Sequence, residues 1–294
     1  SPVFPAVVLL LILIFVGFLG FFTMKFMISD LKFARSLRIA NTNAQSTYQL
    51  ENEAIREFPY RSDYHRVFSQ INLALANSLG QSVPPGSSPS ADVQRNITIL
   101  IQQSINSGRN AVILSPFTSN NWQSLSQIYR SLINVGQNAE RFAIASQDQA
   151  IALDPYNPQL YIQRGGIYYQ LRQFDEAMQQ FQIAVNLKRD FANAYYNLGH
   201  ALEERGDLQN ALAAYQTVKQ LSAGNPANLD SINAEISTLS SKIGKTKASS
   251  NVTPETSQTP LSISTSSAEL PPQKPPIKIS APPQGAEEAT ESAQ

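Results

Sequence analysis

The sequence predicts an all-α protein in which a solenoid of helix-turn-helix pairs lies behind one membrane-spanning helix. Copies of a short block, which reads AIREFP, AVILSP and AIALDP before it degenerates, begin at Ala54, Ala111, Ala150, Ala184 and Val218. The last two steps are both 34 residues, a length typical of helix pairs that bury their apolar faces only by stacking on one another. The second observation is an uncharged, strongly apolar stretch near the start of the chain. We therefore expect about five repeats, the first two degenerate, plus a capping helix.

Residues 1–29 are predicted to form a transmembrane anchor. Residues 3–24 carry no charge, and at about 1.5 Å per residue a helix of this length spans roughly 30 Å, the thickness of a bilayer's hydrocarbon core. A core helix would show one polar face, and this stretch shows none. A signal peptide fits poorly, because the stretch is too long, no basic segment precedes it and no small-residue cleavage site follows it. We expect residues 3–24 to bind the lipid bilayer.

The side of the membrane on which the repeats lie stays open. Lys25, Lys32, Arg35 and Arg38 follow the apolar stretch and outnumber the acidic residues there. The positive-inside rule places such a flank, and the repeats after it, in the cytoplasm. Because the chain begins with Ser-Pro and not with Met, we also consider that further membrane spans precede it, and these would then set the orientation.

Residues 30–118 are predicted to form two divergent helix pairs. Apolar residues recur at helical spacing through them, for example between Tyr64 and Leu79. The Pro/Ser-rich segment 81–90 interrupts the second pair, since Gly and paired Pro end helices. We expect it to be a loop that lengthens this repeat.

The remaining chain divides into three parts. Residues 119–226 show the clearest repeats, and residues 227–243 have their apolar side chains on one helical face, as a capping helix requires. Residues 244–294 hold eight prolines, many Ser and Thr and no aromatic residue. Such a segment buries too little apolar area to offset the entropy of ordering it, so we expect a disordered tail.

Residues 158–226 closely resemble tetratricopeptide (TPR) repeats. The copy that begins at Pro158 holds Tyr161, Gly165, Tyr168, Ala177, Phe181 and Ala184 at the family's signature positions, and the copy that begins at Ala192 holds Tyr195, Leu198, Gly199, Leu202, Ala211 and Tyr215. In this pattern small residues stand where two helices approach closely, while aromatic residues fill the space between pairs. The resemblance implies a fold of stacked helix pairs and a role in protein–protein interaction.

In that family, fixed positions on the first helix of each repeat line the concave face that binds a protein or peptide. On this sequence they fall on Gln123, Gln127, Arg130, Ile162, Tyr169, Asn193, Tyr196, His200 and Glu203. The basic residues with which some members grip the C-terminal carboxylate of chaperones are not matched, because Gln123, Gln127, Gln163, Asn193 and Asn197 stand there. The resemblance thus implies a membrane-anchored scaffold whose partner is not a chaperone tail.

A weaker similarity concerns the order of the segments. An apolar helix followed by divergent and then regular repeats is similar to the C-terminal end of bacterial O-antigen-ligase-like membrane proteins that bear TPR tails. This similarity implies an alternative function, as the accessory solenoid of a larger glycan-transfer enzyme whose catalytic part is absent from this chain. The repeats would then lie outside the cytoplasm.

No pattern in the sequence predicts an enzyme, a cofactor or a metal site. The phosphate-binding P-loop, the HExxH zinc motif and the nucleophile elbow of hydrolases are missing, and there is no cysteine. The two histidines, His65 and His200, lie far apart in the sequence, so no zinc cluster is expected. The 22 basic residues balance 22 acidic ones, which disfavours binding to nucleic acid. We predict a binding protein.

Overall fold

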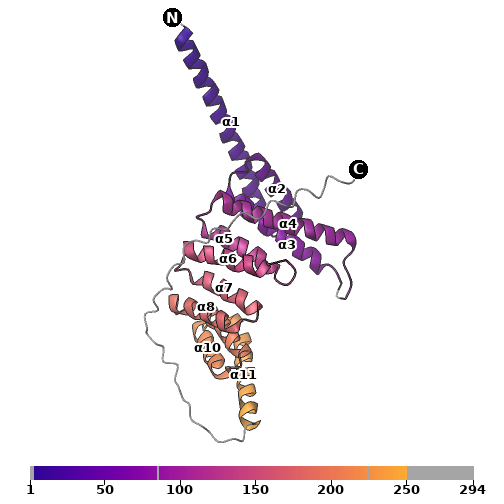
Figure 1. Cartoon of the computed structure of the whole chain (residues 1–294), viewed down its shortest axis with the longest axis vertical. Helices are drawn as coiled ribbons and strands as arrows, with labels where there is room; N and C mark the ends of the chain where they lie inside the picture. Colours follow the sequence, from indigo (N-terminus) through magenta and orange to yellow (C-terminus); the bar gives the residue numbers. More distant parts are fainter. Residues whose placement is uncertain (1–2, 85, 224–225, 250–294) are drawn as a thin grey trace. The chain divides into compact units, whose positions relative to one another are not determined.

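The computed structural model describes residues 3–84, 86–223 and 226–249, and all regular secondary structure in them is helical. In chain order the helices are α1 (Val3–Ile39), α2 (Ala44–Glu57), α3 (Ser62–Gln81), α4 (Ala91–Leu114), α5 (Ser119–Ser131), α6 (Ala139–Leu153), α7 (Pro158–Gln170), α8 (Phe174–Leu187), α9 (Ala192–Glu204), α10 (Leu208–Leu221) and α11 (Pro226–Ser249) (Figure 1). Each helix contacts the next one along the chain. In addition, α3 contacts α5, and α7 contacts α9. The described residues therefore form the all-α, TPR-type solenoid that was predicted, with five helix pairs and a capping helix.

Helix α1 corrects the predicted boundary between the anchor and the repeats. One helix of 37 residues runs from Val3 to Ile39, so the apolar stretch continues directly into the first helix of the first pair. No Pro or Gly follows Gly20 within it, and nothing in the local sequence ends the helix between the two parts. The boundary predicted between residues 29 and 30 therefore lies inside a helix.

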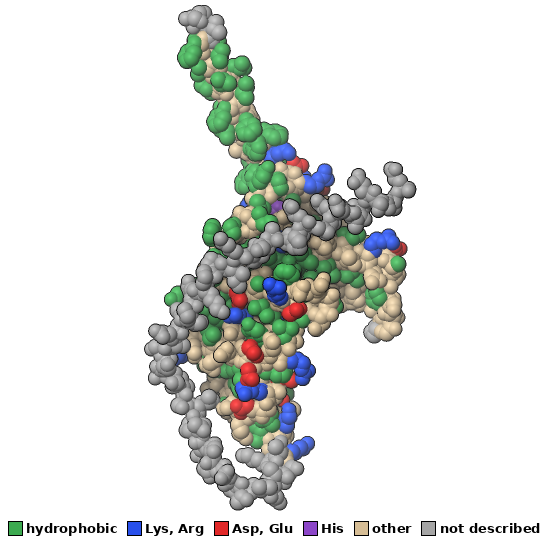
Figure 2. All heavy atoms as spheres, viewed as in Figure 1, with side chains coloured by type: hydrophobic (Ala, Val, Ile, Leu, Met, Phe, Trp, Pro, Cys, Tyr) green, Lys and Arg blue, Asp and Glu red, His purple; other side chains and the backbone are tan. Residues whose placement is uncertain are grey.

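The apolar part of α1 is exposed. The helix from Phe4 to Ile39 is long and apolar enough, by length and composition, to cross a membrane, and none of its most apolar window of 18 residues is buried. Figure 2 shows hydrophobic side chains covering this part of α1. Farther along, Ser29 and Ser36 are fully buried. The packed repeats therefore begin only in the C-terminal part of α1.

The alanine that opens the recurring block closes the second helix of each pair. Ala54, Ala111, Ala150 and Ala184 are at most 1% exposed. Each alanine carbonyl accepts the backbone N–H of the residue four places later, at 3.0–3.1 Å. In three of the pairs a side chain also donates to this carbonyl, namely Ser29 to Ala54, Asn121 to Ala111 and Ser119 to Ala150. A small side chain is needed here because neighbouring helices approach the helix end closely.

The proline that ends the block supplies a hydrogen-bond acceptor for the helix that follows. The residue six places after each proline donates to its carbonyl: His65 to Pro59 at 2.9 Å, Trp122 to Pro116 at 2.7 Å and Tyr161 to Pro155 at 3.0 Å. Three chemically different side chains thus hold the start of a helix pair against the preceding turn. His65 accordingly has a structural partner, and burial lowers the pKa of its imidazole.

The Tyr161→Phe substitution tests this hydrogen bond. We expect it to lower the free energy of unfolding by about 1 kcal/mol, because the Pro155 carbonyl loses its partner. Tyr156 is the matched control, since its side chain is 70% exposed, and Tyr156→Phe should change the free energy by less than about 0.5 kcal/mol. Urea unfolding of the full chain measures both values. Equal losses in the two variants would show that the bond contributes nothing.

In the two regular repeats, a small residue on the first helix leaves room for an aromatic ring on the second helix where the two helices cross. In the regular repeats a glycine meets an aromatic ring, because a Cβ on Gly165 would lie 2.4 Å from the Phe181 ring and one on Gly199 would lie 2.6 Å from the Tyr215 ring. The first three pairs hold other combinations in the same register, namely Ser36 with Glu51, Ser69 with Gly108 and Ser126 with Gln147. The first three pairs therefore differ from the family pattern on both sides of the crossing.

The loop and the cap are close to the predicted ones. Helices α3 and α4 contain 20 and 24 residues, and residues 82–90 join them, one residue shorter than the predicted loop. The Ser90 side chain caps α4 by accepting the Val93 N–H at 3.3 Å. Helix α11 continues to Ser249, past the predicted end at residue 243. The rest of the predicted tail, residues 250–294, lies outside the described residues.

Candidate partner-binding site

The nine predicted binding residues lie on α5, α7 and α9, the first helices of the last three pairs. The structure divides them into three groups according to their surroundings. Five residues are exposed or half-buried on α5, α7 and the start of α9, Ile162 is in the core, and the last three are half-buried and contact the capping helix directly or through one another.

The accessible group centres on Arg130, which reaches from α5 to α7. A Cβ on Gly166 would lie 2.8 Å from the Arg130 guanidinium, so a larger residue there would displace it. The Arg130 Nε donates to the Gln170 Oε1 at 3.3 Å, and the Gln170 amide donates to the Arg130 carbonyl at 3.4 Å. Gln127 is exposed nearby on α5, and Gln123 is half-buried. Arginine and amide side chains therefore join two repeats on one surface.

Partial burial changes the electrostatics of Arg130. Loss of water around the guanidinium lowers the pKa of Arg130. The bonds to Gln170 are made to neutral groups and are long, which leaves the charge incompletely compensated by those bonds. A guanidinium in this state favours a carbonyl or carboxylate from a partner.

Tyr169, on α7, lies near the carboxylates at the C-terminal end of α9. Its ring packs edge-on against Phe174 with ring centroids 5.4 Å apart. Burial raises the pKa of Tyr169, and the charges of Glu204 and Glu203 and a hydrogen bond to Glu204 raise it further. Asn193 is also exposed, near the start of α9. The accessible surface therefore runs from a cation on α5 to carboxylates on α9.

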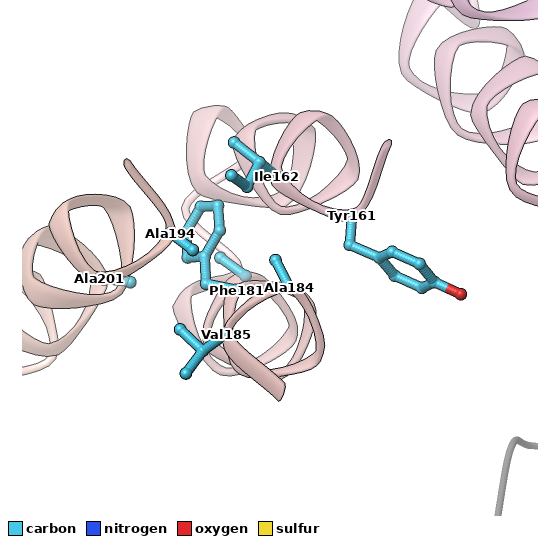
Figure 3. Close-up of a cluster of buried hydrophobic side chains, with 8 residues drawn as sticks. Tyr161, Ile162, Phe181, Ala184, Val185, Ala194 and Ala201 are labelled. Atoms are coloured by element: carbon cyan, nitrogen blue, oxygen red, sulfur yellow. The ribbon is translucent and has the colours of Figure 1, made fainter. Parts of the chain in front are cut away.

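Ile162 is buried, whereas the predicted binding role requires an accessible side chain. It is 7% exposed and packs in one core cluster with Phe181, Ala184 and Val185 (Figure 3). Burying a side chain of this size stabilises the fold by about 1.5–3 kcal/mol relative to exposing it. The position matches the family's binding face, but an isoleucine there turns into the core.

Two residues of the last group, Tyr196 and Glu203, bond to the capping helix α11. The Tyr196 hydroxyl donates to the Glu235 carboxylate at 2.9 Å. The His200 ring lies edge-on to Tyr196, with ring centroids 4.5 Å apart, and to Tyr215 at 5.4 Å. Glu203 accepts from the Tyr215 hydroxyl at 3.4 Å. These contacts form a connected cluster between α9, α10 and α11.

Tyr196, His200 and Glu203 therefore already have partners within this chain, which the prediction of a free binding face did not include. An ion pair between Glu203 and Lys242 of α11, at 3.3 Å, adds to the cluster. Burial and the nearby carboxylates raise the pKa of Tyr215, so its hydroxyl remains a donor. The physical reason is that α11 packs against the last pair in the place where a further repeat would continue the array.

Sequence analysis missed three residues of these surfaces. Gln170 lies four residues after Gly166, and that spacing places both on one helical face, so helical periodicity is the signal that identifies it. Glu235 and Lys242 lie in α11, outside the repeats, and the repeat pattern holds no signal for them. Among the described residues there is no group of three or more His, Cys, Asp or Glu that could hold a metal ion.

Comparisons with known proteins match the repeats. Residues 165–206 match the family model of the TPR repeat, and residues 192–225 match that of the tetratricopeptide repeat. Over 83 residues the chain is 34% identical to the small glutamine-rich tetratricopeptide repeat-containing protein 2 of Mycosarcoma maydis, and over 83 residues it is 34% identical to RNA polymerase II-associated protein 3 of Xenopus laevis. Each match covers 28% of this chain but only 24% and 13% of the two relatives, respectively.

A solved structure extends the likeness to the fold. TTC0263, a TPR protein of Thermus thermophilus, aligns with 72% of this chain and 98% of its own, at a TM-score of 0.52 and 18% identity. At this identity the likeness shows the fold alone. The chain thus contains TPR repeats in a TPR-type solenoid. None of these three matches is an O-antigen-ligase-like protein, so they give the alternative function no support.

Proposed function

We propose that this chain, which carries tetratricopeptide repeats, is a membrane-anchored scaffold that binds a protein or peptide and has no catalytic role. The proposed binding face consists of Gln123, Gln127, Arg130, Tyr169, Gln170 and Asn193. The observation that carries the proposal is the contact of Arg130 with Gly166 and Gln170, which makes one surface from two successive repeats. This face is smaller than the one implied by the family resemblance.

The chemistry of the binding face suits an extended, uncharged polypeptide segment. Each exposed Gln or Asn offers one donor and one acceptor group, which match the C=O and N–H of a peptide unit. Arg130 stands at one end and Glu204 stands near the other, so a bound segment has a preferred direction. A strongly acidic tail is disfavoured, because Arg130 is the one basic residue of the six.

The exposed apolar part of α1 supports the anchoring. Large apolar surfaces of this kind mark contact with a membrane or another protein. Residues 3–24 are uncharged over a length that matches the hydrocarbon core, and their side chains from Phe4 on are exposed all round the helix. A bilayer would remove all these apolar side chains from water at once. A protein partner would have to surround the helix.

Site-specific photo-crosslinking from the binding face tests the proposal. A benzophenone amino acid is placed at Gln127, at Gln170 or, as control, at Gln179, an exposed glutamine on α8. We expect the full chain in its native membrane to yield one shared adduct from Gln127 and Gln170 and none from Gln179. Adding Arg130→Ala should reduce that adduct about tenfold, as expected for a contact worth about 1.4 kcal/mol.

Two results would contradict the binding face. Equal crosslinking from all three positions would mean that the contacts are non-specific. An adduct that persists undiminished in the Arg130→Ala variant would exclude Arg130 from binding. Circular dichroism of each variant shows whether the repeats remain folded.

A further inference from the structure

The turn between α2 and α3 lies beside the end of the apolar stretch. Phe26, two residues after Met24, where the uncharged stretch ends, packs edge-on against Phe58 of that turn, with ring centroids 5.5 Å apart. Phe58 in turn packs against Tyr60 at 5.4 Å. Tyr60 is 66% exposed, although it belongs to this chain of aromatic rings. The turn is thus attached to α1 at the level where its charged residues begin.

Two basic side chains surround the aromatic residues. Lys25, the first charge of α1, lies 3.7 Å from Glu57 and 5.3 Å from the centroid of the Phe21 ring. The Arg61 guanidinium pairs with Asp30 at 2.6 Å and lies over the Phe26 ring, 5.7 Å from its centroid. Each cation therefore contacts both a carboxylate and an aromatic ring. This combination fixes the turn against α1 by both charge and packing.

The direction of the chain places this turn closest to the apolar stretch. The C-terminal part of α1 leads away from the apolar stretch, and α2 runs back along that part of α1. The turn at residues 58–61 follows α2. Because the helix rises about 1.5 Å per residue, Phe26 stands roughly 3 Å beyond Met24, the last residue of the uncharged stretch 3–24. If the stretch fills the hydrocarbon core, the turn stands at headgroup depth.

We infer that Lys25, Phe26, Phe58, Tyr60 and Arg61 form an interfacial collar, which lies in the headgroup layer of the bilayer. The inference rests on the proposed anchoring of residues 3–24. Aromatic rings with a polar tip favour this layer, and long basic side chains extend along apolar surface to reach it. Since α1 continues unbroken into the repeats, a collar held in the headgroup layer also sets the tilt of the first repeat relative to the membrane.

Two later turns offer internal controls. Phe117 and Tyr156 also follow a proline between helix pairs, and they are 88% and 70% exposed. They belong to turns one and two pairs farther along the chain than Tyr60. All three turns thus expose an aromatic residue, and in the first turn the ring of Phe58 also contacts Phe26 of α1.

The depth of single tryptophans in vesicles tests the collar. The native Trp122 is first replaced by tyrosine, because Tyr161 makes the equivalent hydrogen bond in the next repeat. Tyr60→Trp, Phe117→Trp, Tyr156→Trp or Phe15→Trp is then added to the full chain. Each variant is reconstituted into phosphatidylcholine vesicles that carry bromine atoms either near the headgroup or near the chain ends.

We expect shallow bromines to quench the tryptophan of Tyr60→Trp more strongly than deep ones, with a blue-shifted emission. Phe15→Trp should be quenched by the deep bromines, while Phe117→Trp and Tyr156→Trp should show neither quenching nor shift. If Phe15→Trp is quenched but Tyr60→Trp behaves like Phe117→Trp, the collar is excluded and the anchor stands. If Phe15→Trp is not quenched, the anchoring fails and the collar fails with it.

Discussion

Replacing Gly199 by leucine should lower the free energy of unfolding by about 1–3 kcal/mol or more, because the crossing of α9 and α10 has no room for a side chain. A Cβ at this position would lie 2.6 Å and 2.9 Å from two carbons of the Tyr215 ring. That ring is 1% exposed and contacts His200 and Tyr196, so it cannot move without breaking the cluster that holds α11. The expected loss therefore includes the cap as well as the last repeat.

Gly80→Leu is the matched control for this substitution. Gly80 also lies in a helix, α3, but a Cβ there meets nothing within 4 Å. Replacing a helical glycine at an open position should stabilise the protein by up to about 1 kcal/mol. Thermal and urea unfolding of the two variants measure the difference. Equal midpoints would contradict the crossing described here.

The third repeat suggests how the Gly199 crossing can be repaired. It holds Ser126 and Gln147 where the last repeat holds Gly199 and Tyr215. If these sizes compensate, the double variant Gly199→Ser with Tyr215→Gln should be more stable than the sum of its two single variants predicts. Residues in direct contact typically show interaction energies of about 0.5–3 kcal/mol. Strict additivity would mean that the two positions do not compensate.

The free energy of unfolding of the wild type should fall as the pH rises through the acidic range, and Glu51→Gln should abolish that fall. Glu51 is fully buried between α1 and α2, where the Ser36 hydroxyl donates to its Oε1. Its Oε2 is buried and has no hydrogen-bond partner among the described residues. Burial raises the pKa of Glu51 to about 7, and the Ser36 hydrogen bond offsets part of the rise. The folded protein therefore favours the protonated carboxyl.

The sign of the pH dependence follows from the two states. The unfolded chain releases the Glu51 proton near its ordinary pKa of 4.5, whereas the folded chain keeps it until about 7. Between these values the folded state binds more protons, so its free energy of unfolding falls as the pH rises and then levels off. At about 1.36 kcal/mol per pKa unit the total loss is about 3 kcal/mol.

Urea unfolding between pH 4 and pH 8 measures the effect as a difference between variants. The glutamine is neutral throughout, so the stability of Glu51→Gln relative to the wild type should be near zero at pH 4 and rise by about 3 kcal/mol above pH 7. Glu53→Gln, an exposed position on the same helix, should show no comparable rise. A flat difference for Glu51→Gln would mean that the carboxylate is accommodated in the folded state.

The sequence predicted the helix pairs well, because their signals are local. The alanine and proline of the recurring block mark the end of one helix and the start of the next, and both roles depend on residues four to six places away. The break at residues 82–90 was equally predictable from its Gly and Pro content. The continuity of α1 was missed, since a change from apolar to charged residues alters what surrounds a helix without ending it.

The binding site was predicted only in part. The family's groove positions fall on Gln127, Arg130 and Tyr169, on the first helices of their pairs, where Gln127 is exposed and the other two are half-buried. The same reasoning placed Ile162 and Tyr196 on that face, where Phe181 and Glu235 bury or engage them. The position of a residue within its repeat indicates on which helix it lies, but not which neighbouring side chains it contacts.

From the sequence alone, then, the all-α class, the order of the pairs and the apolar length of α1 were determined. These depend on composition and on spacing within a few turns of one helix. The tertiary structure alone decided that Tyr196 bonds to Glu235 of α11, that Arg130 spans two repeats and that Phe26 meets the turn at Phe58. Each of these is a contact between helices, and such contacts depend on how side chains of different sizes fill the space between elements, which no periodicity along one helix records.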